Sequence, residues 1–208
     1  MKTIMVGTAN QAKLSFFEQL LAGYDVSIVG TESLQVPPPD ETGATPLENA
    51  VLKAAYYGQY APVVIAVDSG LYFNELETDD PRQPGLHVRS PEGVRLDDEE
   101  MIRYYAEKIH KLGGRVTAYY LDGTAIKTEN GCFTFMPTQE ELLKTAFTMT
   151  SEPVEARKPG WPLDSLSYDR EGVSFLSPTR RVNAQAGWGY APRLRKYVAE
   201  LLKLQETK

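Results

Sequence analysis

Hydrophobic residues in the first half of the chain follow two alternating patterns, one typical of buried strands and the other of amphipathic helices. Short apolar runs predict strands at 3–7, 26–29 and 63–67. Helical spacing of the apolar positions predicts helices over 10–22 and 46–57. Because strand and helix alternate, this half of the chain is expected to be α/β.

The second of these helices has a start signal in the sequence. It follows a proline-rich connection, 35–43, that cannot be helical. Thr45 occupies the N-cap position, Pro46 the first helical position and Glu48 the third. The inner stripe is expected to consist of Leu47, Val51 and Ala54.

In the second half the pattern changes from helix to hairpin. It predicts a helix at 97–112 and a β-hairpin whose strands are 115–127 and 132–136. A further strand is expected at 147–154 and a terminal helix at 191–204. Residues 139–144 are too few to predict a helix. The segment 157–190 is irregular and rich in Gly, Pro and Ser.

Together these elements predict the fold class α/β, with a two-lobed mixed β-sheet flanked by helices. A chain of 208 residues fits a single domain, 1–208, whose two lobes surround one central substrate cleft.

Composition narrows the classes of function. The formal net charge of -6 gives no general basic field for nucleic acid, so any phosphate binding would depend on a few placed lysines. The single Cys132 excludes an intramolecular disulfide and a cysteine-based zinc cluster. No apolar run approaches the roughly 18 residues of a membrane span, and no secretion signal precedes the first strand. We therefore expect a cytoplasmic protein without a nucleic-acid or membrane partner.

Thr8, Asn10 and Lys13 form the first polar cluster, between the first strand and the first helix. Unsatisfied N–H groups at a helix start favour an anion, and Lys13 on the first turn would add a full positive charge. The alternative is that Thr8 or Asn10 simply caps the helix while Lys13 is solvated.

The second cluster surrounds the start of the helix at 46–57. Glu41 follows three prolines that stiffen its approach, and Lys53 lies on the helix, so a carboxylate and an ammonium group could face the same side. Glu48 and Asn49 stand between them. The alternative is a capped surface helix with an exposed Glu48 to Lys53 face.

Asp68, Ser69 and Gly70 form the third cluster, directly after the apolar run 63–67. We expect the strand to end there, with Asp68 partly desolvated and paired with a cation or metal. Ser69 and Gly70 would form a tight turn that offers N–H groups to the substrate. The alternative is an Asx-turn that only ends the strand.

Two carboxylates and two lysines in one place suit Mg²⁺ and phosphate oxygens rather than zinc. His87 and His110 are too few and too separated for a metal site.

The three clusters together resemble the inosine triphosphate pyrophosphatase family, which acts on non-standard purine nucleoside triphosphates. The matching stretches are TANQAK at 8–13, ETGATPLENAVLKA at 41–54 and VDSGL at 67–71, with a weaker match in PGLHVR at 84–89. The order and spacing of these stretches are more specific than any one of them. The resemblance extends over the first 90 residues.

The resemblance implies an ITPase-like fold and hydrolysis of a nucleoside triphosphate to monophosphate and pyrophosphate, with Mg²⁺ or, as a substitute, Mn²⁺. Carried onto matching positions, the phosphate-binding residues are Thr8, Asn10 and Lys13. Glu41 would bind the metal, and Lys53 would pair with the phosphate chain. Asp68 would hold the metal, orient the attacking water, or do both. The family also implies a homodimer.

Two departures from the family pattern bear on activity and substrate choice. Members commonly have two adjacent acidic residues before the Ser-Gly pair, and here the first is Val67. The base-recognising segments of the family, aromatic-Gly-aromatic-Asp and Ser-His-Arg, have only distorted counterparts at 160–164 and 179–181. Three aromatic residues of this region could stack on a base or pack beneath loops: Trp161, Trp188 and Tyr190.

The sequence therefore predicts a Mg²⁺-dependent nucleoside triphosphate pyrophosphatase with an altered base preference. The alternative is a relative that binds a nucleotide or another phosphorylated ligand without hydrolysing it.

Overall fold

The computed structural model describes residues 1–180 and 189–207 of the chain. These residues fall into two compact units. Unit 1 consists of Met1–Ser69, Asp122–Thr138 and Tyr190–Lys208, and unit 2 of Gly70–Leu121 and Gln139–Gly189. Two long strands contribute residues to both units. The arrangement of two lobes around a central cleft stays a prediction.

The described strands form one mixed sheet of seven strands in the order β2-β1-β3-β4-β6-β7, with β5 paired to β4. Their bounds are β1 Lys2–Val6, β2 Val26–Val29, β3 Val64–Phe73, β4 Arg115–Thr128, β5 Gly131–Phe135, β6 Phe147–Thr150 and β7 Ser167–Tyr168. β1 pairs in parallel with β2 and β3, whereas β4 pairs antiparallel with β5 and β6. The α/β class and the mixed sheet are confirmed.

Five α-helices are described: α1 Gln11–Leu20, α2 Pro46–Tyr57, α3 Asp98–Lys111, α4 Gln139–Lys144 and α5 Ala191–Leu202. Short 3-10 turns add Glu32–Leu34, Pro91–Gly93 and Pro162–Leu166. The elements expected from the sequence are therefore present. In addition, 139–144 does form a helix, and the strand expected over 147–154 is shorter. None of the described helices is both long and apolar enough to cross a membrane.

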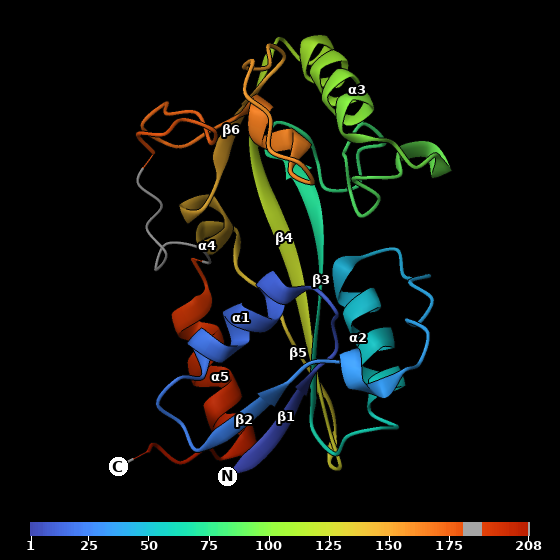
Figure 1. Cartoon of the computed structure of the whole chain (residues 1–208), viewed down its shortest axis with the longest axis vertical. Coiled ribbons are helices and arrows are strands. Elements are labelled where there is room, and N and C mark those ends of the chain that lie inside the picture. Colours follow the sequence, from blue (N-terminus) through green and yellow to red (C-terminus); the bar gives the residue numbers. More distant parts are fainter. Residues whose placement is uncertain (181–188, 208) are drawn as a thin grey trace. The chain divides into compact units, whose positions relative to one another are not determined.

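In unit 1 the strands carry α1 and α5 on one side and α2 on the other (Figure 1). Small side chains let α2 lie close to the sheet, because Ala50 and Ala54 of α2 pack on Ala66 of β3 and Ala125 of β4. Gly123 of β4 has no room for a side chain, since an added Cβ would lie 2.6 Å from the carbonyl carbon of Pro46. The start of α2 is therefore fixed on β4.

This close approach corrects the predicted inner stripe of α2. Ala54 is buried as expected, but Leu47 and Val51 are only partly buried, and Ala50 and Asn49 take the innermost positions. A helix that lies this near a sheet selects small residues at the contact and moves larger ones to its flanks. The predicted helix start is confirmed, because Thr45 Oγ1 accepts a hydrogen bond from the Glu48 amide at 3.2 Å.

Strand β3 corrects a second expectation, because Asp68, Ser69 and Gly70 lie inside it and form no turn. The hydrophobic pattern resumes at Leu71, Tyr72 and Phe73, which are at most 5% exposed and extend the strand into the core of unit 2. β1, however, pairs with β3 only up to Val6 and Ile65. Asp68 is thus held by a continuous strand just past the end of its parallel neighbour.

The core of unit 2 is built around α3 and the adjoining parts of β3, β4 and β6. Asp97 caps α3 through a capping box with Glu100, as the acidic start of this helix suggests. Tyr105 and Ile109 are the largest α3 side chains that are fully buried. α4 packs separately, with Leu142 beside Tyr72 and Tyr119.

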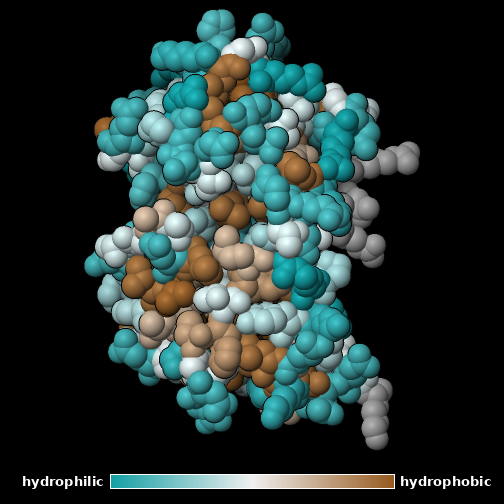
Figure 2. All heavy atoms as spheres, turned by 180° about the vertical axis from the view of Figure 1, so that it is seen from behind, coloured by the Kyte–Doolittle hydropathy of each residue, from teal (hydrophilic) through white to brown (hydrophobic). Residues whose placement is uncertain are grey.

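On the face seen in Figure 2, hydrophobic side chains gather on the part of the surface that unit 1 forms. Large hydrophobic residues exposed in this unit include Leu52 of α2 and Tyr60 just after it, at 39% and 45%. α2 therefore presents hydrophobic side chains to the surface as well as to the sheet.

Candidate functional site

The centre of the candidate site is the side chain of Lys53, on α2. Its Nζ lies 2.7 Å from Asp68 Oδ1 and 2.9 Å from Glu41 Oε1. The Lys53 and Asp68 side chains are only 12% and 11% exposed, whereas Glu41 is 45% exposed. The structure thus brings together three predicted residues from three separate segments. The alternative of an exposed Glu48 to Lys53 face holds for Glu48 but is wrong for Lys53.

The pKa of Lys53 shows how closely it is held by these partners. Burial alone would lower the pKa, but hydrogen bonds and charge attraction from Asp68, followed by those from Glu41, raise it above the usual lysine value. Lys53 is therefore a firmly protonated ammonium group.

Asn49, which the sequence placed in this cluster without a role, ties the cluster together. Its Nδ2 donates to Asp68 Oδ2 at 3.1 Å, and its Oδ1 accepts from the Gly43 amide at 2.7 Å. Asn49 is 1% exposed and comes from the first turn of α2. It thus joins the segment after Glu41 to Asp68, and the helix start also binds Ala44, whose amide donates to Glu48 at 2.7 Å.

Lys13, on α1, is a second cation of the site. Its Nζ donates to the backbone carbonyl of Val67 at 3.4 Å. Burial and the charge of Lys53 lower its pKa, while the charges of Asp68, Asp122 and Glu41 raise it. Lys13 is therefore partly buried and electrostatically coupled to the carboxylates around Lys53, so it is not the solvated lysine of the alternative interpretation.

Asn10 caps α1, as the alternative interpretation stated, whereas Thr8 forms a turn just before the helix. Thr8 Oγ1 accepts from the Asn10 amide at 3.0 Å, and Asn10 Oδ1 accepts from the Lys13 amide at 3.3 Å. Both side chains shape the turn that delivers Lys13. Their part in binding phosphates stays a prediction.

Ser69 and Gly70 have different surroundings. Ser69 Oγ donates a short hydrogen bond to Asp122 Oδ1. Gly70 belongs to unit 2, where an added Cβ would lie 2.8 Å from the Tyr72 ring and 3.0 Å from the Gly85 carbonyl oxygen. A side chain is excluded there by packing, and a role of Gly70 toward substrate stays a prediction.

Asp122 is the residue that sequence reasoning missed as part of the site, and its partner is Tyr190, which the sequence offered only for base stacking or packing. Asp122 is 6% exposed, and its Oδ2 accepts from Tyr190 Oη at 2.8 Å. The signal was a lone acidic residue within the alternating run AYYLDGTAI, followed by the glycine that α2 contacts. Tyr190 is 3% exposed, so it is a packed hydrogen-bond donor rather than a base-stacking residue.

Of the other two aromatic candidates for base recognition, Trp161 is exposed and Trp188 is not described by the structure. Trp161 is 54% exposed, with Lys158 Nζ 4.5 Å from the centre of its ring, and Asp164 pairs with the same lysine at 3.2 Å. Trp188 and Arg181 lie outside the described residues. Trp161 is therefore the candidate whose exposed ring leaves room for a base.

The carboxylates of the site suit Mg²⁺ in one particular way. Among the residues that the structure describes, no three His, Cys, Asp or Glu side chains are grouped so as to hold a metal ion. Mg²⁺ commonly takes one or two carboxylates from a protein and completes its shell with water and substrate phosphates. Glu41 and Asp68, which share Lys53 as neighbour, fit this incomplete set.

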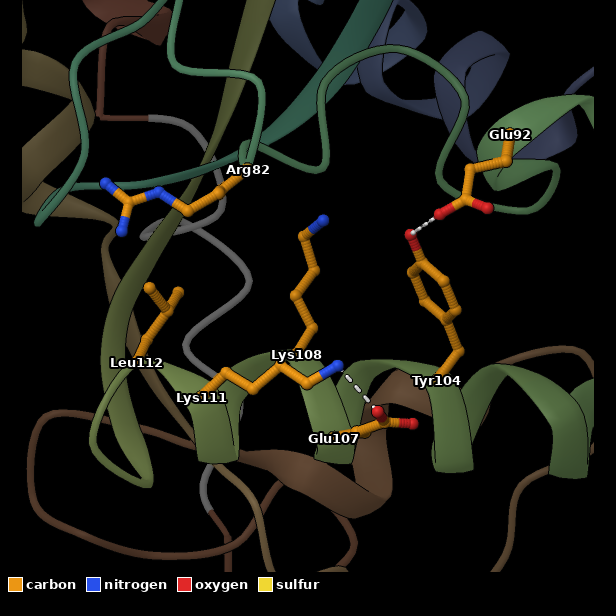
Figure 3. A pocket seen from close by; sticks show the side chains of 7 residues that line it. All are labelled: Arg82, Glu92, Tyr104, Glu107, Lys108, Lys111 and Leu112. Atoms are coloured by element: carbon orange, nitrogen blue, oxygen red, sulfur yellow. Dashed lines mark hydrogen bonds and ion pairs between the residues drawn. The ribbon is translucent and has the colours of Figure 1, made fainter.

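A separate pocket of about 380 Å³ lies in unit 2 on α3 (Figure 3). Its charged side chains are largely paired: Lys111 with Glu107 at 2.6 Å, and Tyr104 Oη with Glu92 at 3.4 Å. Arg82 of the preceding loop pairs with Asp80 and lowers the pKa of that carboxyl to about 2. The pocket thus consists mainly of local surface ion pairs, unlike the buried cluster at Lys53.

Comparisons with known proteins identify the family of the chain. The Ham1 family model matches residues 4–135, a range that contains every residue of the Lys53 cluster, Lys13 and Asp122. The dITP/XTP pyrophosphatases of Shewanella oneidensis and Vibrio cholerae are 32% and 39% identical over 103 and 99 residues, which is 49% and 47% of this chain and 48% of each relative. The chain thus spans about half the length of the curated relatives it matches.

Solved structures extend the likeness in fold to nearly the whole chain. A HAM1 protein from Coxiella burnetii has a TM-score of 0.70 at 22% identity, and the Ham1 protein of Staphylococcus aureus one of 0.63 at 21%. Each match covers 96% of this chain and 100% of the other. The match of the family model to residues 4–135 confirms the resemblance noted in the sequence, and the chain belongs to the Ham1 family.

Proposed function

We propose that this protein hydrolyses non-standard purine nucleoside triphosphates between the α and β phosphates, releasing a nucleoside monophosphate and pyrophosphate. The observation that carries the proposal is the buried Lys53 ammonium group, held between Glu41 and Asp68 and coupled to Lys13. Such a group of acids and lysines is suited to phosphoryl chemistry. The relatives named dITP/XTP pyrophosphatase support the same reaction and the same class of substrate.

Each charged residue has a role in this proposal. Lys13 and Lys53 neutralise the negative charge of the phosphate chain, and Thr8 and Asn10 shape the turn beside it. Glu41 and Asp68 hold Mg²⁺, or Mn²⁺ in its place, and Asp68 also orients the attacking water. The ion would supply further neutralisation of the developing charge. Asn49 keeps the Asp68 carboxylate in its position by the hydrogen bond at 3.1 Å.

The charge of the site supports a need for a divalent cation. The Glu41 and Asp68 carboxylates lie beside Lys53. A triphosphate brought to this site would be repelled by these two carboxylates, because like charges in a partly buried place interact strongly. A divalent cation held by Glu41 and Asp68 would supply positive charge that offsets the repulsion.

A screen for pyrophosphate release tests the proposal. The purified protein, with Mg²⁺ or Mn²⁺, is given ITP, dITP and XTP, with dATP and dGTP as controls. We expect release from at least one non-standard purine triphosphate and much less from the controls. Absence of release from the whole panel would overturn the proposal.

The alternative is a relative that binds a nucleotide or another phosphorylated ligand without hydrolysing it. One observation favours this alternative: Val67 is apolar and 2% exposed where the family commonly has an acid. Thermal stabilisation by triphosphates without any product would support the alternative, and steady pyrophosphate formation would exclude it. The homodimer and the cytoplasmic location stay predictions.

A further inference from the structure

Asp122 lies on the same face of the sheet as Val67, the position at which this chain lacks the acid that is common in the family. Along a strand, successive side chains point to opposite faces. Ala66 and Asp68 of β3 face α2, so Val67 and Ser69 face away from it. On β4, Gly123 and Ala125 face α2, so Asp122 faces away from it too. The hydrogen bond from Ser69 to Asp122 confirms that these two share a face.

Two hydroxyl groups hold the buried carboxyl group of Asp122. Ser69 Oγ donates to Oδ1 and Tyr190 Oη donates to Oδ2, so both carboxylate oxygens accept hydrogen bonds. Burial raises the pKa of Asp122 above its usual value, and the charge of Asp68 adds to that rise. The two hydrogen bonds and the charge of Lys13 act in the opposite direction, because they favour the ionised form. A carboxylate as buried as this is costly unless its partners are fixed.

Asp122 is also one of the charges that act on Lys13. Lys53 disfavours the protonated form of Lys13, and the opposing carboxylates are those of Asp68, Asp122 and Glu41. Asp122 therefore links a hydroxyl of β3, a hydroxyl next to α5 and the cation on α1.

We propose that Asp122 is a positioning residue of this site, which supplies from β4 the acid that Val67 does not supply from β3. Held by Tyr190, it orients the Ser69 hydroxyl, and its charge favours the protonated form of Lys13. This inference rests on the proposed function and deepens it, because it assigns a substitute for the acid whose absence favoured a non-hydrolysing protein.

The first test compares Asp122→Asn and Tyr190→Phe with the unchanged protein, using whichever triphosphate is turned over. We expect kcat to fall about tenfold or more in Asp122→Asn, since hydrogen bonds to charged groups are strong, and KM to change much less. Tyr190→Phe should lower kcat by a smaller factor. Unchanged kcat in Asp122→Asn would overturn the inference.

The pH profile separates positioning from a merely structural role. Asp122 raises the pKa of Lys13, so its removal lets Lys13 lose its proton at a lower pH. The alkaline limb of the kcat profile should therefore move to lower pH in Asp122→Asn. An alkaline limb that does not move would contradict the assigned link to Lys13.

Thr124→Val is the matched control. Thr124 lies on the same face of β4, is fully buried, and its Oγ1 has no hydrogen-bond partner among the described residues. Valine replaces it with nearly the same shape, so kcat and its pH profile should stay unchanged. A loss equal to that of Asp122→Asn would show a general sensitivity of this strand and overturn the inference.

Moving the carboxylate from position 122 to position 67 tests directly whether Asp122 replaces the acid that is missing at Val67. Asp122→Val should lose activity, and adding Val67→Asp should recover part of it, because both positions face the same side. Thermal melting shows whether each variant is folded. A folded double variant that recovers no activity would contradict the proposal that Asp122 replaces the acid missing at Val67.

Binding of inorganic triphosphate keeps this inference separable from the proposed hydrolysis. If the unchanged protein releases no pyrophosphate, calorimetry of inorganic triphosphate between neutral and alkaline pH still reports on Lys13. Loss of binding at a lower pH in Asp122→Asn would support the positioning role while hydrolysis fails. Hydrolysis by the unchanged protein together with identical behaviour of Asp122→Asn would overturn the inference alone.

Discussion

Lys53 and Lys111 make ion pairs of nearly equal length in very different surroundings. Lys53 Nζ lies 2.7 Å from Asp68, and Lys111 Nζ lies 2.6 Å from Glu107. Yet Lys53 is 12% exposed and takes carboxylates from two distant segments, whereas Lys111 is 70% exposed and takes a carboxylate from one turn earlier on α3. The length of an ion pair therefore says little about its importance.

The two ion pairs differ in importance because they differ in exposure to water. An exposed pair one helical turn apart contributes only about 0.3–0.5 kcal/mol, because water screens both charges. Removing one partner of a buried pair leaves a charge without compensation and costs about 3–5 kcal/mol. A buried cluster of this kind is kept despite its cost, which is why the Lys53 cluster is a better candidate for chemistry than the α3 pocket.

The largest effect should come from Asp68→Asn, matched with Glu107→Gln in the α3 pocket. Both changes remove one negative charge from an ion pair and keep the shape of the side chain. We expect pyrophosphate release to fall at least about a hundredfold in Asp68→Asn, since the carboxylate is proposed to hold Mg²⁺ and orient the water. Glu107→Gln should leave the rate unchanged. Equal rates for the two variants would break the comparison.

The next effect concerns how α2 is held on β4. Gly123→Ala places a methyl group 2.6 Å from the carbonyl carbon of Pro46, and backbone atoms cannot move aside as a flexible side chain can. The free energy of unfolding, measured with urea, should fall by about 1–3 kcal/mol, as for other overpacked sites. Gly30→Ala is the control, since the atoms nearest to its added Cβ belong to the Glu32 side chain, which is exposed and can turn away at the loss of one exposed hydrogen bond from Gln11. A similar loss in both variants would contradict the close packing of α2.

The sequence predicted most elements of the fold because their local signals agree with their final environment. Helix α2 begins and ends where its cap and apolar pattern indicate, and the hairpin of β4 and β5 follows the turn signal between its strands. β3 was different, since polar residues at 68–70 resemble a strand end. Only the second core, which buries Leu71 and Phe73, extends the strand through them.

The site was predictable where the chain carries its motif and not where it depends on a neighbouring strand. The meeting of Glu41, Lys53 and Asp68 was expected, because the family pattern joins these positions. Asp122 lies more than fifty residues along the chain from Asp68. Its part in the site arises from the pairing of β3 with β4 and from the return of Tyr190 to unit 1, which no local pattern records.

A smaller effect should separate stability from activity at Lys13. Burial lowers the pKa of Lys13, so the folded state disfavours its charge. Lys13→Met should therefore raise the free energy of unfolding near pH 7 by about 1 kcal/mol, while triphosphate binding is lost. The gain should shrink as pH rises toward about 10.4, where lysine also loses its charge in the unfolded chain.

Urea denaturation at pH 7 and at high pH measures this gain in the free energy of unfolding. Lys111→Met is its counterpart on α3, where the ammonium group is 70% exposed and no burial cost is removed. The free energy of unfolding should therefore not rise in Lys111→Met. A Lys13→Met protein that is less stable than the unchanged one at pH 7 would show that the lysine contributes more through its contacts than it loses through burial.

The smallest effect should be that of Glu107→Gln on stability. The Glu107 carboxylate is 68% exposed, and its partner Lys111 can turn into water when the pair is lost. We expect the free energy of unfolding to change little at low salt and not at all in high salt, which screens exposed charges. Urea denaturation at low and high salt measures both. A change as large as that of Gly123→Ala would mean that the exposed pair of Glu107 and Lys111 stabilises the fold as strongly as a buried ion pair. The difference in burial between Lys53 and Lys111 would then not explain why only the Lys53 cluster is a candidate for chemistry.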